Sequence, residues 1–379
     1  MVVLKESNFS QSRIFFMDYL RAFAVILVVL AHSAIAYMQN LADFWYIYDS
    51  NVSILMDLTV FLVDKFVMVL LFFIAGFFSL YSLTKMDLLS YLRKRFIRIG
   101  IPLMIGIVFF NPVVTYISKV TKKNIVDDYA SYWINDYFVE GIQLNYLWFL
   151  LVLLIFTVTL GFIYQYKKDI FNFTQSKDFS YKPMLFVFTI CLIIYFISTI
   201  ITSDYDWFYI GNTRLLQPTR MIFYVTFFCL GVYAYKNHWF ISNFSKKKSL
   251  YWFVLAFISA VVLGLFYNFY YPDLLYSTPL KIINSFLVCI LTIFSIIALV
   301  CLFKNFLNIP SKIGRMISDN SYSIYLLHYP FVVFFQYYLL SYDMFFLFKF
   351  IIVFIFSLVL SLFLSKYFLR RLPGLGVVF

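Results

Sequence analysis

Long apolar segments alternate with short polar ones along the whole chain. Each apolar segment holds roughly 18 to 25 residues, which is enough for a helix to cross a hydrocarbon core of about 30 Å. The ten segments lie at about 14–38, 62–83, 99–118, 145–166, 184–203, 219–236, 250–271, 281–303, 317–340 and 344–368. The pattern predicts an all-α fold, a polytopic bundle of about ten transmembrane helices.

The composition supports this prediction. Hydrophobic residues make up 63% of the chain and charged residues only 13%, whereas a soluble domain carries about 25% charged residues. No repeat, low-complexity tract or flexible linker divides the sequence. We therefore expect a single transmembrane domain over residues 1–379, in contact with membrane lipids.

The basic residues indicate how the chain is oriented. The net charge is +12, but Lys and Arg form short clusters between apolar segments instead of the continuous stripe that binds nucleic acid. Alternate connections hold 21 basic residues on one side and five on the other. Because positive residues accumulate on the cytoplasmic side, the count predicts a multi-pass membrane protein with both termini in the cytoplasm. The sequence gives no indication of oligomeric state.

The N-terminal segment allows a second interpretation. Lys5 and Arg13 precede an apolar run, and the small residues Ala34–Ala36 follow it, which is the layout of a cleaved signal peptide. Against this, three ionisable residues lie within the same predicted helix, and the later loops give a consistent topology when this helix is kept. We therefore count it as the first span.

Polar residues interrupt the apolar pattern just before the second span. Asp57, Asp64 and Lys65 lie between about residues 50 and 65. This interruption predicts an interfacial helix that leads into the span.

The first predicted helix carries Asp18, Arg21 and His32. An ionisable group inside a span costs at least a few kcal/mol, so it usually faces a cavity and marks function. Asp18 and Arg21 are three residues apart and can pair. Arg21 and His32 are eleven apart, which places them on nearly the same helix face with a rise of about 16 Å. The alternative is a histidine of the packed interior above an arginine that reaches the headgroups.

A basic cluster precedes the third span. Arg93, Lys94, Arg95 and Arg98 form a predicted cytoplasmic turn, and Pro102 follows them, where it can bend the helix open. Paired arginines can hold phosphates by charge-assisted hydrogen bonds. The alternative is an anchor that only sets the orientation of the chain.

Two further groups of residues are candidates for a binding site. Ser321, Tyr325 and His328 are spaced to share one face of the ninth span, and Trp148 lies at the outer end of the fourth. Trp148 could equally belong to the aromatic belt of a membrane interface. The third histidine, His238, is expected in a cytoplasmic loop without a role. Scattered histidines and four isolated cysteines give no ligand set for a metal.

These motifs, in this order, resemble the acyltransferase-3 family of membrane O-acyltransferases. The resemblance extends over nearly the whole chain and rests on Phe16–Arg21 with His32, Phe72–Phe77, Arg95 and Arg98 with Pro102, Leu147–Leu150, and Ser321–His328. Ala75 departs from the serine that many members have before the glycine. Arg98–Pro102 and Leu147–Leu153 are most similar to the glucan succinyltransferases of bacterial inner membranes.

The resemblance implies a reaction across the membrane. Acyl-CoA would arrive from the cytoplasm as donor, with succinyl-CoA favoured over acetyl-CoA, and an osmoregulated periplasmic glucan or a similar glycan would be the acceptor. His32 would act as general base or form an acyl-histidine. Asp18 and Arg21 would position the donor or the helix. Arg95 and Arg98 would bind the phosphates, and Arg93 and Lys94 would add positive electrostatic potential. The acceptor would be bound by Trp148, Tyr325, His328 and Ser321.

Two questions remain open at this stage. A succinyl group needs a cation for its free carboxylate, and Lys65 and Arg220 are candidates by position. The rival function is a transporter or flippase of a glycan or lipid-linked sugar, because intramembrane His and Arg also serve substrate paths and proton relays.

Overall fold

The computed structural model of the chain describes residues 14–40, 45–123, 128–172, 182–204, 206–210, 213–240, 245–271 and 273–371. Lys5, Arg13 and the two ends of the chain, on which part of the orientation rests, lie outside the described residues. Within them the fold is a bundle of helices with one small antiparallel hairpin, formed by β1 (Phe208–Ile210) and β2 (Thr213–Leu216). The all-α prediction is confirmed.

The helices follow the apolar segments of the sequence. Their bounds are α2 Phe15–Ile35, α3 Ile54–Leu83, α4 Leu88–Arg95, α5 Ile101–Ile105, α6 Asn111–Lys123, α7 Tyr129–Ser131, α8 Trp148–Tyr166, α9 Lys182–Ile201, α10 Pro218–Lys236, α11 Lys246–Tyr270, α12 Thr278–Phe306, α13 Lys312–Leu339 and α14 Phe346–Tyr367. Polar residues that suit helix N-termini begin several of them. Ser53 and Ser311 cap α3 and α13 with their side chains, and α10 starts on Pro218.

Eight helices among the described residues are long and apolar enough to cross a membrane, with α4 to α6 forming one of them as Leu88–Lys122. The chain is thus a multi-pass membrane protein. The other two predicted spans form α10 and α13, which are long helices of lower hydropathy because they carry polar residues such as Arg220, Asp319 and His328. Both pack inside the bundle, α10 against α3, and α13 against α2 and α14.

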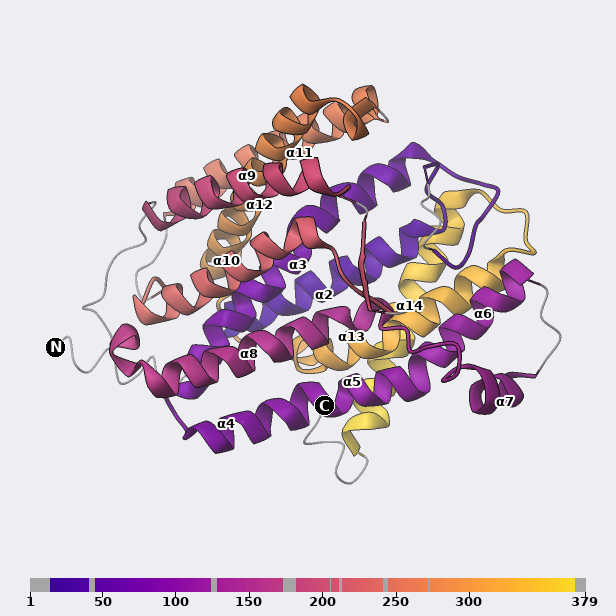
Figure 1. Cartoon of the computed structure of the whole chain (residues 1–379), viewed down its shortest axis with the longest axis horizontal. Helices are drawn as coiled ribbons and strands as arrows, with labels where there is room; N and C mark the ends of the chain where they lie inside the picture. Colours follow the sequence, from indigo (N-terminus) through magenta and orange to yellow (C-terminus); the bar gives the residue numbers. More distant parts are fainter. Residues whose placement is uncertain are drawn as a thin grey trace.

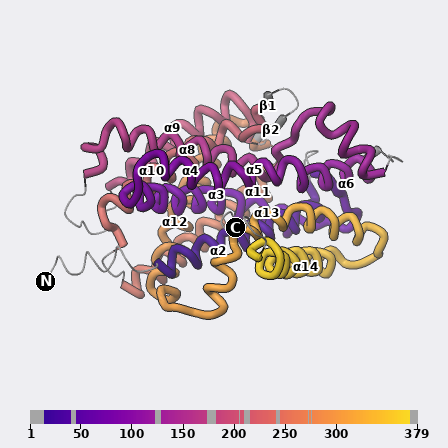
Figure 2. Tube along the Cα trace, turned by 90° about the horizontal axis from the view of Figure 1, so that it is seen from below, coloured from indigo at the N-terminus to yellow at the C-terminus, as the bar shows by residue number. Residues whose placement is uncertain are grey.

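The central helices are α2 and α3. Figure 1 shows them in the middle of the bundle, with α9, α11 and α12 on one side and α4 to α6 along the opposite edge. In the second view, α4, α5 and α6 follow one another in nearly one line (Figure 2). Residues that face the interior from α2 and α3 are therefore enclosed by other helices on several sides.

Two glycines let α3 and α10 cross in close contact. A Cβ atom on Gly76 would overlap the carbonyl oxygen of Phe228, and a Cβ on Gly231 would overlap the carbonyl oxygen of Phe73. Small residues at such crossings let two backbones approach closely within a membrane. The crossing fixes α10, and with it Arg220, against the N-terminal half of α3.

The predicted interfacial helix before the second span is wrong. Helix α3 begins at Ile54 and continues without a break to Leu83, so the polar residues belong to the span itself. Their polar groups are satisfied inside the protein. The backbone N–H groups of Gln39 and Asn40 donate to the buried carboxylate of Asp57 over 2.6 and 2.9 Å.

The predicted cytoplasmic turn at Arg93–Pro102 is also wrong, because these residues are helical. A π-turn over Phe96–Gly100 joins α4 to α5, and the N–H of Ile101 donates to the carbonyl of Phe96, five residues back. Pro102 has no N–H and cannot make the regular bond to Arg98. A second π-turn at Gly106–Phe110 precedes Pro112 in the same way. Such turns often lie at functional sites.

Candidate functional site

Two cavities formed by described residues include most of the candidate site residues in their lining. The larger, of about 540 Å³, includes His32 in its lining and is called the His32 cavity. The smaller, of about 380 Å³, includes Arg21, Arg95 and Arg98 and is called the arginine cavity. The sequence placed these arginines and His32 in one pathway, and the structure assigns them to two separate chambers.

The two cavities follow one another along the same helices. Helix α2 contributes Arg21 to one and His32 to the other, and α3 likewise contributes Ser79 and Asp64. The side chain of Tyr325 lines both cavities. It therefore lies on the wall between them.

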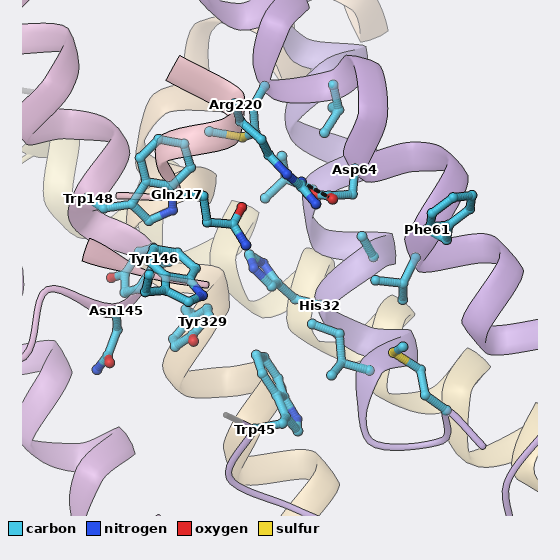
Figure 3. Close-up of a pocket in the computed structure, with 18 of the residues that line it drawn as sticks. His32, Trp45, Phe61, Asp64, Asn145, Tyr146, Trp148, Gln217, Arg220 and Tyr329 are labelled. Atoms are coloured by element: carbon cyan, nitrogen blue, oxygen red, sulfur yellow. Dashed lines mark hydrogen bonds and ion pairs between the residues drawn. The ribbon is translucent and has the colours of Figure 1, made fainter. Parts of the chain in front are cut away.

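His32 is paired with a second histidine. Its Nδ1 lies 3.0 Å from Nε2 of His328, and the two ring planes are inclined by 22°, with centroids 5.2 Å apart. Trp45 stacks on the His32 ring with a centroid distance of 5.8 Å, and Tyr329 packs edge-on at 4.9 Å. Figure 3 shows the imidazole directed into the space bounded by Gln217, Trp148 and Tyr146.

Gln336 on α13 fixes the backbone around His32. Its amide nitrogen donates to the carbonyls of His32 and Ser33 over 3.0 and 3.2 Å. Its amide oxygen accepts from the indole of Trp45 over 3.0 Å. One buried side chain therefore holds both His32 and the ring that stacks on it.

Two tyrosines join the start of α8 to α13 beside the histidine pair. The hydroxyl of Tyr146 donates to the carbonyl of Leu326 over 2.6 Å, and the hydroxyl of Tyr325 donates to the carbonyl of Tyr146 over 2.5 Å. Tyr146 also stacks on Tyr329 at 4.3 Å. These reciprocal bonds hold the wall between the two cavities together.

A group of four charges lies at the end of the His32 cavity remote from the arginine cavity. Arg220 pairs with Asp64 and lies 3.8 Å from Asp204, while Lys65 pairs with Asp204 at 2.6 Å. Two cations and two anions leave this group neutral. Burial by itself would raise the pKa of Asp204, but the positive charges of Lys65 and Arg220 outweigh it and hold that pKa well below its usual range.

Of the two candidate cations for a succinyl carboxylate, only Arg220 lines the His32 cavity. Lys65 is buried and directed to Asp204. Asp64 and Asp204 both face Arg220, so an incoming carboxylate would compete with two anions already in place.

The arginine cavity has a different charge balance. Arg21, Arg95, Arg98 and Arg370 line it together with one acid, Asp319. Asp18 pairs with Arg21 at 3.2 Å, which confirms the pairing that their spacing predicts. The guanidinium of Arg95 lies 4.7 Å above the ring of Tyr91. An excess of arginine makes this cavity suited to an anion.

Arg93 and Lys94 do not line the arginine cavity. Both are exposed on the same helix, beside the two arginines that do line it. The basic cluster of the sequence is thus divided into two residues that reach the cavity and two that do not.

The predicted acceptor residues lie in different places. Trp148 lines the His32 cavity, and Ser321 lines the arginine cavity. His328 is fully buried beside His32. Ser321 and His328 lie on one face of α13 but seven residues apart, which is about two helical turns. The same face can therefore reach both cavities.

Sequence reasoning assigned no site role to several residues that line the His32 cavity, among them Trp45, Asp64, Tyr146, Gln217 and Tyr329. Tyr146 and Tyr329 directly precede or follow recognised motifs, and Asp64 is an acid within an apolar helix, so each carried a local signal. Trp45 and Gln217 lie in connecting segments, and only the tertiary structure brings them to His32. Among the described residues no cluster of His, Cys, Asp and Glu could hold a metal ion.

Comparison with known proteins gives matches to one family. The acyltransferase domain family matches residues 14–366. The chain is 26% identical to glucans biosynthesis protein C of Escherichia coli O157:H7 over 234 residues, which cover 59% of this chain and 58% of that protein. The Shigella boydii serotype 4 protein of the same name is 25% identical over the same length. The chain thus matches less than two thirds of these relatives. No solved structure matches it at a significant level.

Proposed function

Because the chain belongs to the acyltransferase-3 family, we propose that it transfers an acyl group from acyl-CoA in the arginine cavity to a glycan hydroxyl in the His32 cavity. The observation that carries this proposal is the placement of one histidine, close to the wall between a cationic chamber and an aromatic one. The relatives named for glucan biosynthesis support a glucan as acceptor.

The arginine cavity suits the donor. CoA carries several phosphates, and arginine holds phosphate by bidentate, charge-assisted hydrogen bonds. Arg95 and Arg98 reach the cavity from the π-turn region, and Arg21 from α2. The thioester lies at the end of a long flexible arm, so a nucleotide bound here can present its acyl carbon past Tyr325 to His32.

The His32 cavity suits a sugar. Trp45, Trp148 and Tyr329 provide aromatic faces that can pack against sugar rings, and Asn145 and Gln217 add amide groups that can bond hydroxyls (Figure 3). The charged group at its end is neutral overall, which suits an uncharged polyol.

The reaction needs one proton acceptor. A glycan hydroxyl attacks the thioester carbonyl carbon while His32 takes its proton as general base. The C–O bond forms, the C–S bond breaks, and the departing CoA sulfur receives the proton from His32. The products are the acylated glycan and CoA thiol, and no other reactant is required.

We further propose the bacterial inner membrane as the location, with the arginine cavity on the cytoplasmic side. Succinyl is the first acyl group to test and acetyl the second. Arg220 is the one Lys or Arg among the described residues that line the His32 cavity, and it already pairs with Asp64 and lies near Asp204. The choice between the two donors therefore depends on measurement.

The test is acyl transfer by purified protein in lipid nanodiscs, with labelled succinyl-CoA and acetyl-CoA offered separately together with a periplasmic glucan. We expect transfer by the wild type and a loss of at least about a hundredfold with His32→Ala. His238→Asn is the matched control, because it removes a histidine that lines neither cavity. Asn also tolerates the positive φ of 55° at this position.

Either of two outcomes overturns the proposal. Full activity of the His32→Ala variant would remove the proposed base. Absence of transfer with every donor and acceptor, in protein that melts cooperatively, would favour the transport of a glycan or lipid-linked sugar instead.

A further inference from the structure

We infer that His328 is a positioning residue that holds His32 in one tautomer, with a proton on Nδ1 and the lone pair of Nε2 open to the cavity. This inference rests on the proposed function for its catalytic meaning and specifies which ring nitrogen of His32 receives the proton. It is carried by two hydrogen bonds in series.

The first bond fixes His328. Its Nδ1 lies 2.6 Å from the carbonyl oxygen of Tyr325 and 3.2 Å from that of Ile324. Carbonyl oxygens only accept hydrogen bonds, so Nδ1 of His328 carries a proton. In the neutral ring, Nε2 then has a lone pair and acts as an acceptor.

The second bond fixes His32. Nε2 of His328 lies 3.0 Å from Nδ1 of His32. Since Nε2 accepts, Nδ1 of His32 must donate, which leaves the lone pair of the neutral ring on Nε2. A backbone carbonyl of α13 thus determines the tautomer of a histidine on α2 through two successive hydrogen bonds.

The surroundings prevent the ring from turning away from this arrangement. Trp45 stacks on one face of His32, Tyr329 packs edge-on against it, and Gln336 holds the backbone carbonyl of His32. His328 is fully buried. The pair is therefore a built arrangement on rigid helices and not a chance contact of two mobile side chains.

A neutral partner also suits the location. In serine hydrolases a carboxylate orients the histidine, but an ionised carboxylate buried in a membrane bundle costs several kcal/mol unless it is paired. His328 supplies the same orientation without a charge. During transfer the hydroxyl proton moves to Nε2 of His32 and then to the CoA sulfur, while the Nδ1 proton of each ring stays where it is.

The first test reads the tautomer directly and needs no activity. The chain has three histidines, so protein labelled with ¹⁵N in the imidazole rings gives few nitrogen signals in nanodiscs, and His238→Asn and His328→Gln assign them. We expect His32 to show a protonated Nδ1 and an unprotonated Nε2. A His32 protonated on Nε2 in the wild type would overturn the inference.

The second test compares two substitutions of His328. Gln can place an acceptor oxygen near the position of Nε2, whereas Leu fills the space without one. We expect His328→Leu to lower kcat about a hundredfold or more with little change in either KM, since an orienting residue of this kind contributes up to about 10⁴ in kcat elsewhere. His328→Gln should recover at least about tenfold of that loss.

The readouts separate the two proposals. In His328→Leu, the ¹⁵N signals of His32 should show a mixture of tautomers, which a purely structural role would not produce. Unchanged kcat in a folded His328→Leu protein would overturn the inference while leaving His32 as base. If the wild type transfers no acyl group, the proposed function fails, and the wild-type tautomer still decides the inference.

Discussion

Charge is sorted between the two cavities at the level of single residues. Four arginines and one acid line the arginine cavity, whereas the charged group beside the His32 cavity has two cations and two anions. An excess of cations attracts a phosphate, and a neutral, hydrogen-bonding surface accepts a hydroxyl-rich ligand. Arginine therefore makes one cavity positive, where it outnumbers the acids, and leaves the other neutral, where Arg220 lies between two aspartates.

We predict that Arg98→Gln raises the KM for acyl-CoA by about tenfold or more, because a hydrogen bond to a charged group contributes about 1.5–3 kcal/mol. Arg93→Gln removes the same charge from the same helix but outside the cavity. It should change KM by less than about threefold. Steady-state kinetics at varied acyl-CoA concentration measures the KM of both variants. Equal increases in KM would show that only the overall charge matters.

The charged group also predicts a pH dependence of stability. The pKa of Asp204 is depressed in the folded protein by Lys65 and Arg220, so this carboxylate stabilises the fold above its unfolded pKa of about 3.9 and loses that contribution as pH falls below it. Asp204→Asn should lower Tm at pH 7, and the difference from wild type should narrow below about pH 4. Melting by tryptophan fluorescence in detergent at several pH values checks this. A difference that is constant with pH would contradict it.

At the level of elements, the α3–α10 crossing depends on two glycines, which have no side chain. Gly76 and Gly231 face the backbone of the opposite helix, so the two helices can separate only if Arg220 moves away from Asp64. The electrostatics of the His32 cavity are therefore coupled to helix packing about three turns away.

We predict that Gly231→Ala destabilises the protein by about 3 kcal/mol or more, because its Cβ would overlap a backbone carbonyl that cannot move aside. Gly264→Ala is the matched control. A Cβ there would meet only the side chains of Leu58 and Leu62, at 3.7 and 3.8 Å. This control should be neutral or gain up to about 1 kcal/mol. Thermal melts of the Gly231→Ala and Gly264→Ala variants measure both effects. Equal stability of the two variants would refute the close crossing of α3 and α10.

The π-turns before Pro102 and Pro112 give the third span its particular shape. Each places one extra residue in a helical turn, which shifts the faces of the helix on either side relative to each other. Arg98 lies within the first of these turns and reaches the arginine cavity. The proline therefore contributes to the site through helix register and not by opening a loop.

At the level of the whole molecule, the two cavities are proposed to face opposite sides of the membrane. Val139→Cys, at an exposed position between α7 and α8, and Lys167→Cys, at the end of α8, should lie on opposite sides. In a variant whose four native cysteines are replaced by alanine, a membrane-impermeant maleimide applied to intact bacteria should label only Val139→Cys. Lysed cells should label both. Labelling of Lys167→Cys alone in intact cells would reverse the orientation.

Much of the candidate site was predictable from the sequence because an ionisable residue in a span is exceptional. Asp18, Arg21 and His32 were found by that signal, and their helical spacing placed them on one face. The division of the basic cluster was not predictable, since the assumed turn is a helix on which Arg95 and Arg98 line the arginine cavity and Arg93 and Lys94 do not. Trp45 and Gln217 carried no signal, because residues in connections have no periodic pattern.

The sequence by itself determined the helices and their membrane character, because the cost of unsatisfied backbone in lipid leaves few alternatives to apolar helices. It also determined which residues are too polar for their surroundings. Only the tertiary structure decided their partners: His328 beside His32, Arg220 between two aspartates, and Tyr325 on the wall of both cavities. These contacts join residues far apart in the chain, and the rotation and register that bring them together come from helix packing, which local patterns do not encode.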